Sequence, residues 1–354
     1  MEEMSLAAVA KMFSDEPAAW EYVEKLRWDG KPVCPRCGST DVLFLQPRTD
    51  TSRLTKTGKT SHRRVWKCSD CKRQFSVLIG TIFEGSKIPL RKWLMAIYLM
   101  CAGKNGCAAL ELQRDLEITY KSAWFMVHRI REAMMHSPNT NKLFGIIVAD
   151  ETFVGGEPKN RHGHKAGEGG QRKSDKTPVF SIVDKRTGEI RSQVVPNVRS
   201  STIGKVINQN VDKLGSILHT DSATQYLTIG RRFVKHESVN HSEHEYVRNG
   251  VSTNILESHF SQFKRSLDGT FHNVSKEHLN RYAREFDFRA VTRKGSDGER
   301  CMTVFGRSEG VAISYQRLIS TGPIAMGTRP RPVGRPGPRT ASASLLRPVS
   351  GDAG

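Results

Sequence analysis

Residues 145–150 read GIIVAD and residues 216–221 read SILHTD, two short apolar runs that each end on an aspartate. Such runs are typical of buried strands. Because a strand holds its backbone rigidly, we expect Asp150 and Asp221 at fixed positions at a sheet edge. Further patterns indicate strands at 179–184 and 190–195 and a helix at 203–214. Strands interleaved with helices predict a mixed α/β domain.

A long helical pattern follows in STNILESHFSQFKRSL, residues 252–267, with Ser252 or Thr253 as its expected N-cap. Beside its apolar face runs a polar stripe that holds Asn254, Glu257 and Lys264. Glu257 and Lys264 are therefore expected to point the same way, two turns apart.

Two strand-end aspartates and a helical glutamate, in this order, fit metal-dependent phosphoryl transfer. Mg²⁺ prefers hard oxygen ligands, and two ions bridged by carboxylates can hold the attacking and leaving oxygens of a displacement. We expect Asp150, Asp221 and Glu257 to bind two Mg²⁺ or Mn²⁺ ions and Lys264 to hold a DNA phosphate. A single acid would mean little, since most are solvated surface residues. Glu151, on the opposite side of its strand from Asp150, and Glu157 are interpreted as such surface acids.

Four cysteines form two CxxC pairs, CPRC at 34–37 and CSDC at 68–71. Four thiolates in two tight turns suit one tetrahedral Zn²⁺ with no open position, so the predicted role of the ion is structural. A redox pair and unrelated buried cysteines are the alternatives, and the chain lacks a thioredoxin-like context for the former. Trp66 and Phe75 are expected to form the ribbon's small core. The predicted zinc ligands are Cys34, Cys37, Cys68 and Cys71.

The 30 residues between the CxxC pairs are strongly basic and predict an extended hairpin that contacts phosphate through Arg63 and Arg64. After the ribbon, residues 89–135 carry two or three helical patterns. We interpret them as a helix-turn-helix whose last helix directs Tyr120, Lys121, His128, Arg129 and Arg131 outward to a major groove. An ordinary layer of packed helices is the alternative.

The whole chain has 354 residues, with 55 Lys and Arg against 36 Asp and Glu and a net charge of +19. This surplus suits a polyanion, although charge alone does not separate DNA from RNA or an anionic membrane. The N-terminus lacks a signal pattern, and the longest apolar stretch is too short to span a bilayer. We therefore expect a cytoplasmic, nucleoid-associated protein. The Pro- and Arg-rich residues 321–354 predict a disordered basic tail.

Taken together, these motifs resemble the bacterial insertion-sequence transposases of the DDE superfamily that carry an N-terminal zinc ribbon, the ISXO-like group. The resemblance spans about residues 15–290. The stretches that carry it are WEYVEKLRWDGKPVCPRCGS, KCSDCKRQFSVLIGTIFEGSKIPLRKWLMAIYLM, ITYKSAWFMVHRIREAM, ADETFVGGEPKNRH, LHTDSATQY and VNHSEHEYVRNGVSTNILESHFSQFKRSLDGTFHNVSKEHLNRYAREFDFR.

The resemblance implies a ribonuclease H-like catalytic fold, divalent metal, and recognition of an element's terminal inverted repeats as double-stranded DNA. It also implies that Asp150 and Asp221 are catalytic. Members of the group have an acid or Asn at the third position. Here Glu257, with Lys264 seven residues on, is favoured over Asn254, which stays a neighbouring ligand of metal or phosphate. After Phe288 the family usually continues FRYNRR, whereas this chain reads FRAVTRKGSDGER.

The expected organisation is a zinc ribbon plus helix-turn-helix followed by a ribonuclease H-like mixed-sheet domain. Its expected parts are an N-terminal helical segment (1–29), the ribbon (30–80), the helix-turn-helix-like region (85–138), the catalytic domain (143–295), a C-terminal extension (296–320) and the tail (321–354). The expected DNA contacts are Arg63, Arg64, Lys121, Arg129, Arg131, Lys264 and Arg265.

The function expected from this organisation is transposition: cleavage at the element's ends and strand transfer into target DNA by a homo-oligomer, without a small-molecule cofactor. The alternatives are a metal-dependent nuclease or resolvase without strand joining, and a DNA-binding regulator with an inert acidic domain.

Overall fold

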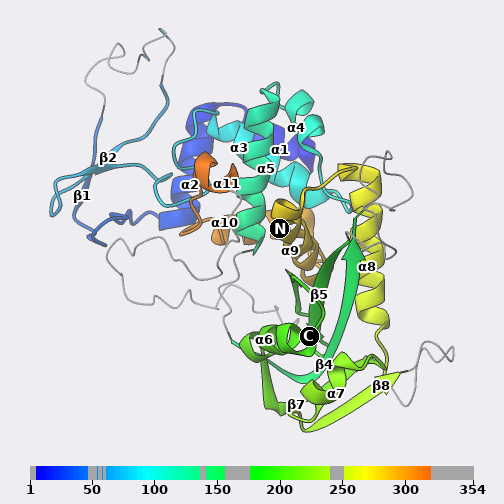
Figure 1. The fold of residues 1–354 in the computed structure, drawn as a ribbon. Helices are drawn as coiled ribbons and strands as arrows, with labels where there is room; N and C mark the ends of the chain where they lie inside the picture. The colour runs from blue at the N-terminus through cyan, green and yellow to red at the C-terminus, as the bar shows by residue number, and fades with distance from the viewer. Residues whose placement is uncertain are drawn as a thin grey trace, which may run out of the picture.

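The computed structural model describes residues 5–46, 54, 58, 61–135, 141–155, 176–239 and 251–319. Glu157 and the expected tail at 321–354 lie outside these residues. The described chain has three parts: a small sheet at the left of Figure 1, a helical body above the centre, and a larger sheet with its helices below. None of the described helices has the length and apolar character needed to cross a membrane.

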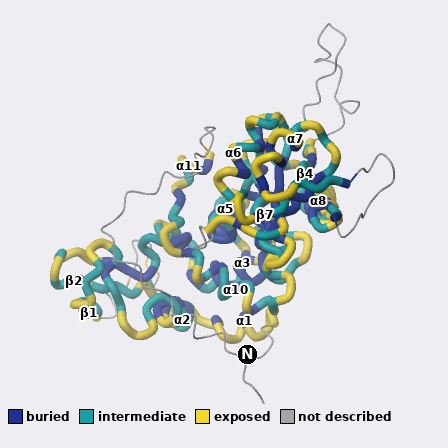
Figure 2. The backbone as a smooth tube through the Cα atoms, turned by 90° about the horizontal axis from the view of Figure 1, so that it is seen from below, coloured by how far each residue is buried: buried dark blue, intermediate teal, exposed yellow. Residues whose placement is uncertain are grey.

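The small sheet contains the two CxxC turns. Its antiparallel strands are β1 (Val42–Phe44), β2 (Trp66–Cys68) and β3 (Gln74–Phe75), in the order β1-β2-β3. Trp66 and Phe75 pack with Trp28 around Cys34 and Cys68, so the predicted ribbon core is confirmed. Most of the ribbon's other surface is half-buried or exposed, as the teal and yellow tube in Figure 2 shows. A core this small is of the kind that a structural metal ion stabilises in other proteins.

The helical body is built from both ends of the chain. Its helices are α1 (Leu6–Met12), α2 (Glu16–Trp28), α3 (Leu90–Ala102), α4 (Ala109–Asp115), α5 (Tyr120–Met135), α10 (Asp297–Gly306) and α11 (Tyr315–Ile319). The prediction of two or three helical segments at 89–135 is therefore confirmed, and the structure has three: α3, α4 and α5. The side chains of Ser5 and Asp15 accept hydrogen bonds from the first turns of α1 and α2 and fix where these helices begin.

Residues 296–319, the described part of the expected C-terminal extension at 296–320, lie within this body. Cys301 and Val304 of α10 are buried in the same core as Trp93, Ile97 and Ile130. The Arg300 guanidinium donates to the Cys101 carbonyl oxygen at the end of α3. The sequence after Phe288 thus completes the core of the helical body.

The larger sheet is mixed. Its strands are β4 (Leu143–Val154), β5 (Thr177–Asp184), β6 (Ile190–Val194), β7 (Val211–Asp221) and β8 (Lys235–Val239), in the order β6-β5-β4-β7-β8. β5 is antiparallel to β4 and β6, whereas β7 is parallel to β4 and β8. If these five strands are numbered 1 to 5 along the chain, their order in the sheet is 3-2-1-4-5, which is the arrangement of a ribonuclease H-like fold. The expected fold class is therefore confirmed.

Successive side chains of β4 point to opposite faces of the sheet. Ile147 and Ala149 pack against α6 (Ser200–Asn210) and α7 (Gln225–Gly230). Val148 packs on the other face against α8 (Asn254–Ser266), through Leu256 and Phe260. α9 (Lys276–Val291) covers the β6 side of this second face and also packs against α5, so it joins the sheet to the helical body (Figure 1).

One sequence expectation needs correction here. The helix expected at 203–214 ends at Asn210, and β7 begins at Val211, whose extended backbone pairs with Leu143. A buried β-branched side chain with a strand partner overrides the helical spacing. The helix expected at 252–267 is present as α8 with Thr253 as its N-cap, and a π-helical turn, η4 (Leu267–Phe271), follows it before α9.

Candidate active site and zinc centre

The predicted catalytic aspartates lie side by side on the two central parallel strands. β4 and β7 pair with a constant offset of 71 from Gly145↔Ser216 to Val148↔His219. The same offset continues to Asp150 and Asp221, and neighbouring strands are about 4.8 Å apart. Both side chains are half-buried. Asp221 is the last residue of β7, as expected, whereas Asp150 lies inside β4, which continues to Val154. The register nevertheless brings both acids to the same level of the sheet.

Glu257 comes to the same face of the sheet on α8. Leu256 and Phe260 fix this helix against Val148, two residues before Asp150. Thr253, the N-cap, makes no capping hydrogen bond with its side chain. Instead its Oγ1 donates to Oε1 of Glu257 over 2.9 Å, which orients the carboxylate. Sequence reasoning identified Thr253 only as a cap and missed this role.

The pKa of Asp150 reflects its burial and the charges of the neighbouring acids. The pKa of Asp150 is raised to about 7. Burial is the main cause, one hydrogen bond from the Glu151 backbone N–H opposes it, and the negative charges of Glu151, Asp221 and Glu257 add to it. That bond, from Glu151 N to Asp150 Oδ1, measures 2.7 Å. Carboxylates that repel one another in this way are the hard-oxygen donor set that divalent cations stabilise.

The three carboxylates are neighbours, but their oxygens are not gathered at coordinating distance. Among the described residues, only the cysteine cluster brings three or more potential metal ligands within 4.8 Å of one another. The donor types at the acidic site fit Mg²⁺ or Mn²⁺, and Asp150, Asp221 and Glu257 are the residues that would hold them. Asn254 occupies the first turn of α8, one turn before Glu257, and is exposed.

Glu151 differs from the sequence interpretation. It does lie on the opposite face of β4 from Asp150, in phase with Ile147 and Ala149. It is half-buried rather than solvated, because Oε2 accepts a hydrogen bond from the Tyr226 hydroxyl and Oε1 accepts one from Nε2 of Gln225 at 2.6 Å. Both partners belong to α7, which begins four residues after Asp221. Glu151 therefore ties the segment that follows Asp221 to the strand that carries Asp150. The sequence did contain a signal of this role, because Glu151 falls on the same side of the strand as the apolar residues Ile147 and Ala149.

The four predicted zinc ligands form one cluster. The Sγ atoms of Cys34 and Cys71 are 3.7 Å apart and those of Cys37 and Cys68 are 3.5 Å apart. Zn–S bonds of about 2.3 Å in a tetrahedron place sulfurs roughly 3.8 Å apart, so the cluster fits one Zn²⁺. The backbone N–H of Cys71 lowers the pKa of Cys68 to about 7, which favours the thiolate that binds metal.

Two of the expected DNA contacts are wrong, because the second half of α5 lies in the centre of the helical body. The exposed fractions of His128, Arg129 and Arg131 are 0%, 4% and 1%. Arg129 donates to the backbone oxygens of Glu84 and Ile313, and Arg131 pairs with Glu285 of α9. Helical spacing predicted that these cations lie on an exposed face of α5. It could not show that α9 and the C-terminal segment cover this face, because both segments are distant in the sequence.

Arg64 is also committed within the protein. Its guanidinium donates to Glu24 and Glu21 of α2 at 2.8 Å and 3.2 Å and lies over the Phe44 ring. It therefore fixes the ribbon to α2 rather than presenting a free charge. The remaining expected DNA contacts are exposed: Arg63, Lys121, Lys264 and Arg265. Tyr120 and Lys121 stand at the exposed start of α5, where a recognition helix meets base edges.

Two protein-family models match the chain, one over the zinc ribbon and one over the domain that contains the acidic site. A transposase zinc-ribbon domain matches residues 14–74, and an ISXO2-like transposase domain matches residues 142–290. The chain belongs to the ISXO2-like DDE transposases. Over 291 residues the transposase is 28% identical to an uncharacterised protein in transposable element ISH50 of Halobacterium salinarum, a match that covers 79% of this chain and 92% of that protein.

Comparison with solved structures gives weaker likenesses. A chain of the simian T-cell lymphotropic virus intasome, in complex with the PP2A regulatory subunit B56 gamma, is 12% identical with a TM-score of 0.26; the match covers 50% of the transposase and 63%, less than two thirds, of that chain. A chain of a pre-cleavage Mos1 transpososome is 11% identical with a TM-score of 0.25, over 57% of the transposase and 74% of that chain.

Proposed function

We propose that this transposase cleaves DNA at the terminal inverted repeats of an insertion sequence and joins the new 3′ ends to target DNA. The observation that carries the proposal is the common level of Asp150 and Asp221 on adjacent parallel strands, with Glu257 on the helix that covers the same face. Three acids so placed suit phosphoryl transfer with divalent metal, in which the ions stabilise the attacking and leaving oxygens.

In this proposal the protein's own groups have distinct tasks. Asp150 and Asp221, fixed by the sheet, would hold divalent metal at a rigid position. Glu257, whose carboxylate accepts a hydrogen bond from Oγ1 of Thr253, would complete the ligand set. Lys264, exposed two turns further along α8, holds a phosphate of the bound strand. The zinc ribbon and the exposed start of α5 bind the duplex, and a homo-oligomer brings two ends together.

The test uses purified full-length protein, Mg²⁺, and a labelled plasmid that bears the element's flanking inverted repeats. We expect nicks at the repeat ends and labelled products joined to target DNA. Asp150→Asn should bind the repeats and give neither product. Cleavage without joining would show a nuclease or resolvase instead, and specific binding without cleavage by the wild type would show a regulator.

A further inference from the structure

A cavity of about 290 Å³ lies where the catalytic domain meets the helical body. Its walls come from α8, α9, α10, the segment that joins α9 to α10, the start of β6 and the linker between α3 and α4. Four cationic side chains line it: Lys104, Arg289, Arg293 and Arg300. Among the described residues that line the cavity there is no Asp or Glu, so its lining is positive.

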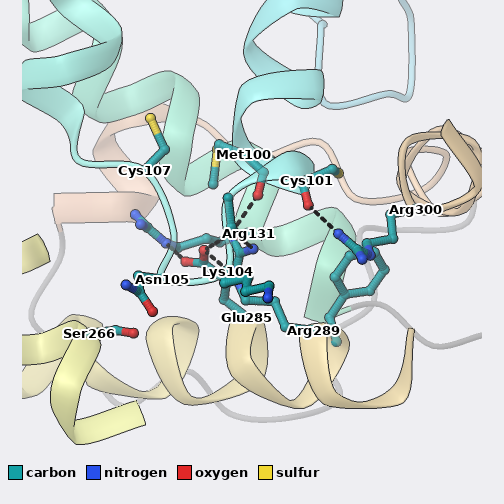
Figure 3. A network of polar contacts seen from close by, with 12 residues as sticks. Met100, Cys101, Lys104, Asn105, Cys107, Arg131, Ser266, Glu285, Arg289 and Arg300 are labelled. Carbon is teal, nitrogen blue, oxygen red and sulfur yellow. Dashed lines mark hydrogen bonds and ion pairs between the residues drawn. The ribbon is translucent and has the colours of Figure 1, made fainter. Parts of the chain in front are cut away.

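Two of these cations are fixed parts of the wall (Figure 3). Arg289 donates to the backbone oxygens of Met100 and Gly103 and pairs with buried Glu285. Glu285 also pairs with Arg131, so two guanidiniums share one carboxylate and one positive charge is left over. Arg300 donates to the Cys101 carbonyl oxygen over 2.9 Å and pairs with Asp297.

The other two cations are free to meet a ligand. Lys104 and Arg293 are both exposed, and neither side chain has an ion-pair or hydrogen-bond partner within the described part of the chain. Apolar side chains also line the cavity, from Ile190, Ile255 and Phe286. Free cations together with apolar side chains suit a ligand that has both anionic and carbon-rich parts.

The position of the cavity indicates which ligand this is. Ser258 lines it and directly follows Glu257 on α8, so the cavity is about 100° around the same helix from the acidic site. We propose that this cavity binds the sugar–phosphate backbone of the DNA strand that enters the acidic site, with Lys104 and Arg293 contacting its phosphates. The inference rests on the proposed function only in taking DNA as the partner.

The first test is the salt dependence of DNA binding by full-length protein. Each phosphate contact contributes about 0.9 to the slope of log affinity against log salt. Lys104→Ala with Arg293→Ala should therefore reduce the slope by roughly 1.8 and weaken binding at least tenfold at low salt. The charge-preserving pair Lys104→Arg and Arg293→Lys should restore both. The matched control is Lys11→Ala with Lys205→Ala, which removes two exposed lysines from α1 and α6.

The second test locates the contact. Single neutral methylphosphonates are placed in turn along the strand near the cleaved end. One or two positions should weaken wild-type binding and have no further effect on the Lys104/Arg293 double alanine variant, as expected of a coupled pair. Additive losses at every position, or an equal loss in the control variant, would overturn the proposal. If wild-type protein cleaves and joins DNA while the double alanine variant binds like wild type, the proposed function stands and the cavity assignment falls.

Discussion

Arg131 of α5 and Glu285 of α9 form an ion pair of 2.6 Å whose side chains are 1% and 0% exposed. Arg131 also lies 4.0 Å from the centroid of the Tyr282 ring, and Glu285 receives a second pair from Arg289. A charge buried this deeply is stable only while its partner is present. The pair therefore locks the helical body to the helix that covers the catalytic sheet.

Removing Arg131 should destabilise the protein rather than weaken a DNA contact directly. Arg131→Ala leaves the buried Glu285 with one of its two cations, and the expected loss in free energy of unfolding is about 3–5 kcal/mol. Urea unfolding measures it. The exposed Lys121→Ala is the comparison: it should retain stability and lose DNA affinity. If Arg131→Ala unfolds at the wild-type urea concentration, the pair does not lock the two parts together.

The third catalytic position can be decided between two neighbours on α8. Glu257→Gln is nearly isosteric, so it should retain folding and end binding while abolishing cleavage and joining, because an amide does not neutralise Mg²⁺ as a carboxylate does. Asn254→Ala should be milder. Single-turnover cleavage measures both. Near wild-type cleavage by Glu257→Gln, with an inactive Asn254→Ala, would move the assignment to Asn254.

The raised pKa of Asp150 gives a pH dependence with a definite sign. Its pKa is about 7 in the folded protein against an ordinary value of 3.8, so the protonated form is favoured by folding. Without added Mg²⁺, the contribution of Asp150 to the free energy of unfolding is fully present below about pH 4 and is lost as pH rises through 7. We expect Asp150→Asn to flatten the stability profile between about pH 4 and 7 in urea unfolding. Equal slopes for both proteins would contradict the assignment.

Metal affinity should follow the same group in the opposite direction. Mg²⁺ binds the ionised carboxylate, so its affinity for the wild type should fall as pH drops below 7. Stabilisation by added Mg²⁺ should therefore be larger at pH 8 than at pH 6 in the wild type and nearly absent in Asp150→Asn. Thermal unfolding with and without Mg²⁺ checks both.

Zn²⁺ should be required for the folding of the ribbon and not for the folding of the five-stranded sheet. Cys68→Ser removes one of four sulfurs, and the bound Zn²⁺ should fall from one per chain toward zero, as elemental analysis would show. Since metal binding there supplies folding energy, protease should cut the ribbon while the five-stranded sheet stays resistant. Full zinc content in Cys68→Ser, or none in wild-type protein, would be inconsistent with a four-cysteine site.

Glu151 should act on the metal site through position. Glu151→Gln weakens the anchor between β4 and α7, so Asp221 is held less firmly and Mn²⁺ binding should weaken roughly tenfold, as for other supporting groups of metal sites. Calorimetric Mn²⁺ titration of the zinc-loaded protein measures it. Glu24→Gln, a buried carboxylate bound by Arg64 and Trp66 beside the ribbon, is the control and should leave Mn²⁺ affinity unchanged. An equal loss in both variants would indicate general destabilisation.

Local pattern was sufficient wherever a residue's role is set by its own segment. The CxxC turns fixed the zinc ligands because two residues between cysteines suffice to point both sulfurs inward. The apolar runs that end at Asp150 and Asp221 gave the two strands, because alternation and burial are local properties. The polar stripe of α8 likewise gave Glu257 and Lys264, since 3.6 residues per turn decides which side chains share a face.

Only the tertiary structure decided what covers each face. Helical spacing shows that Arg129 and Arg131 share a side of α5, but that side is buried because α9 and the segment after Phe288 return to pack on it. The same long-range packing placed α10 in the helical body, tied Glu151 to Tyr226, and formed the cavity beside α8. These contacts join residues that are from 75 to 199 positions apart in the chain. No local periodicity records such a partner, because burial is decided by whichever segment packs there.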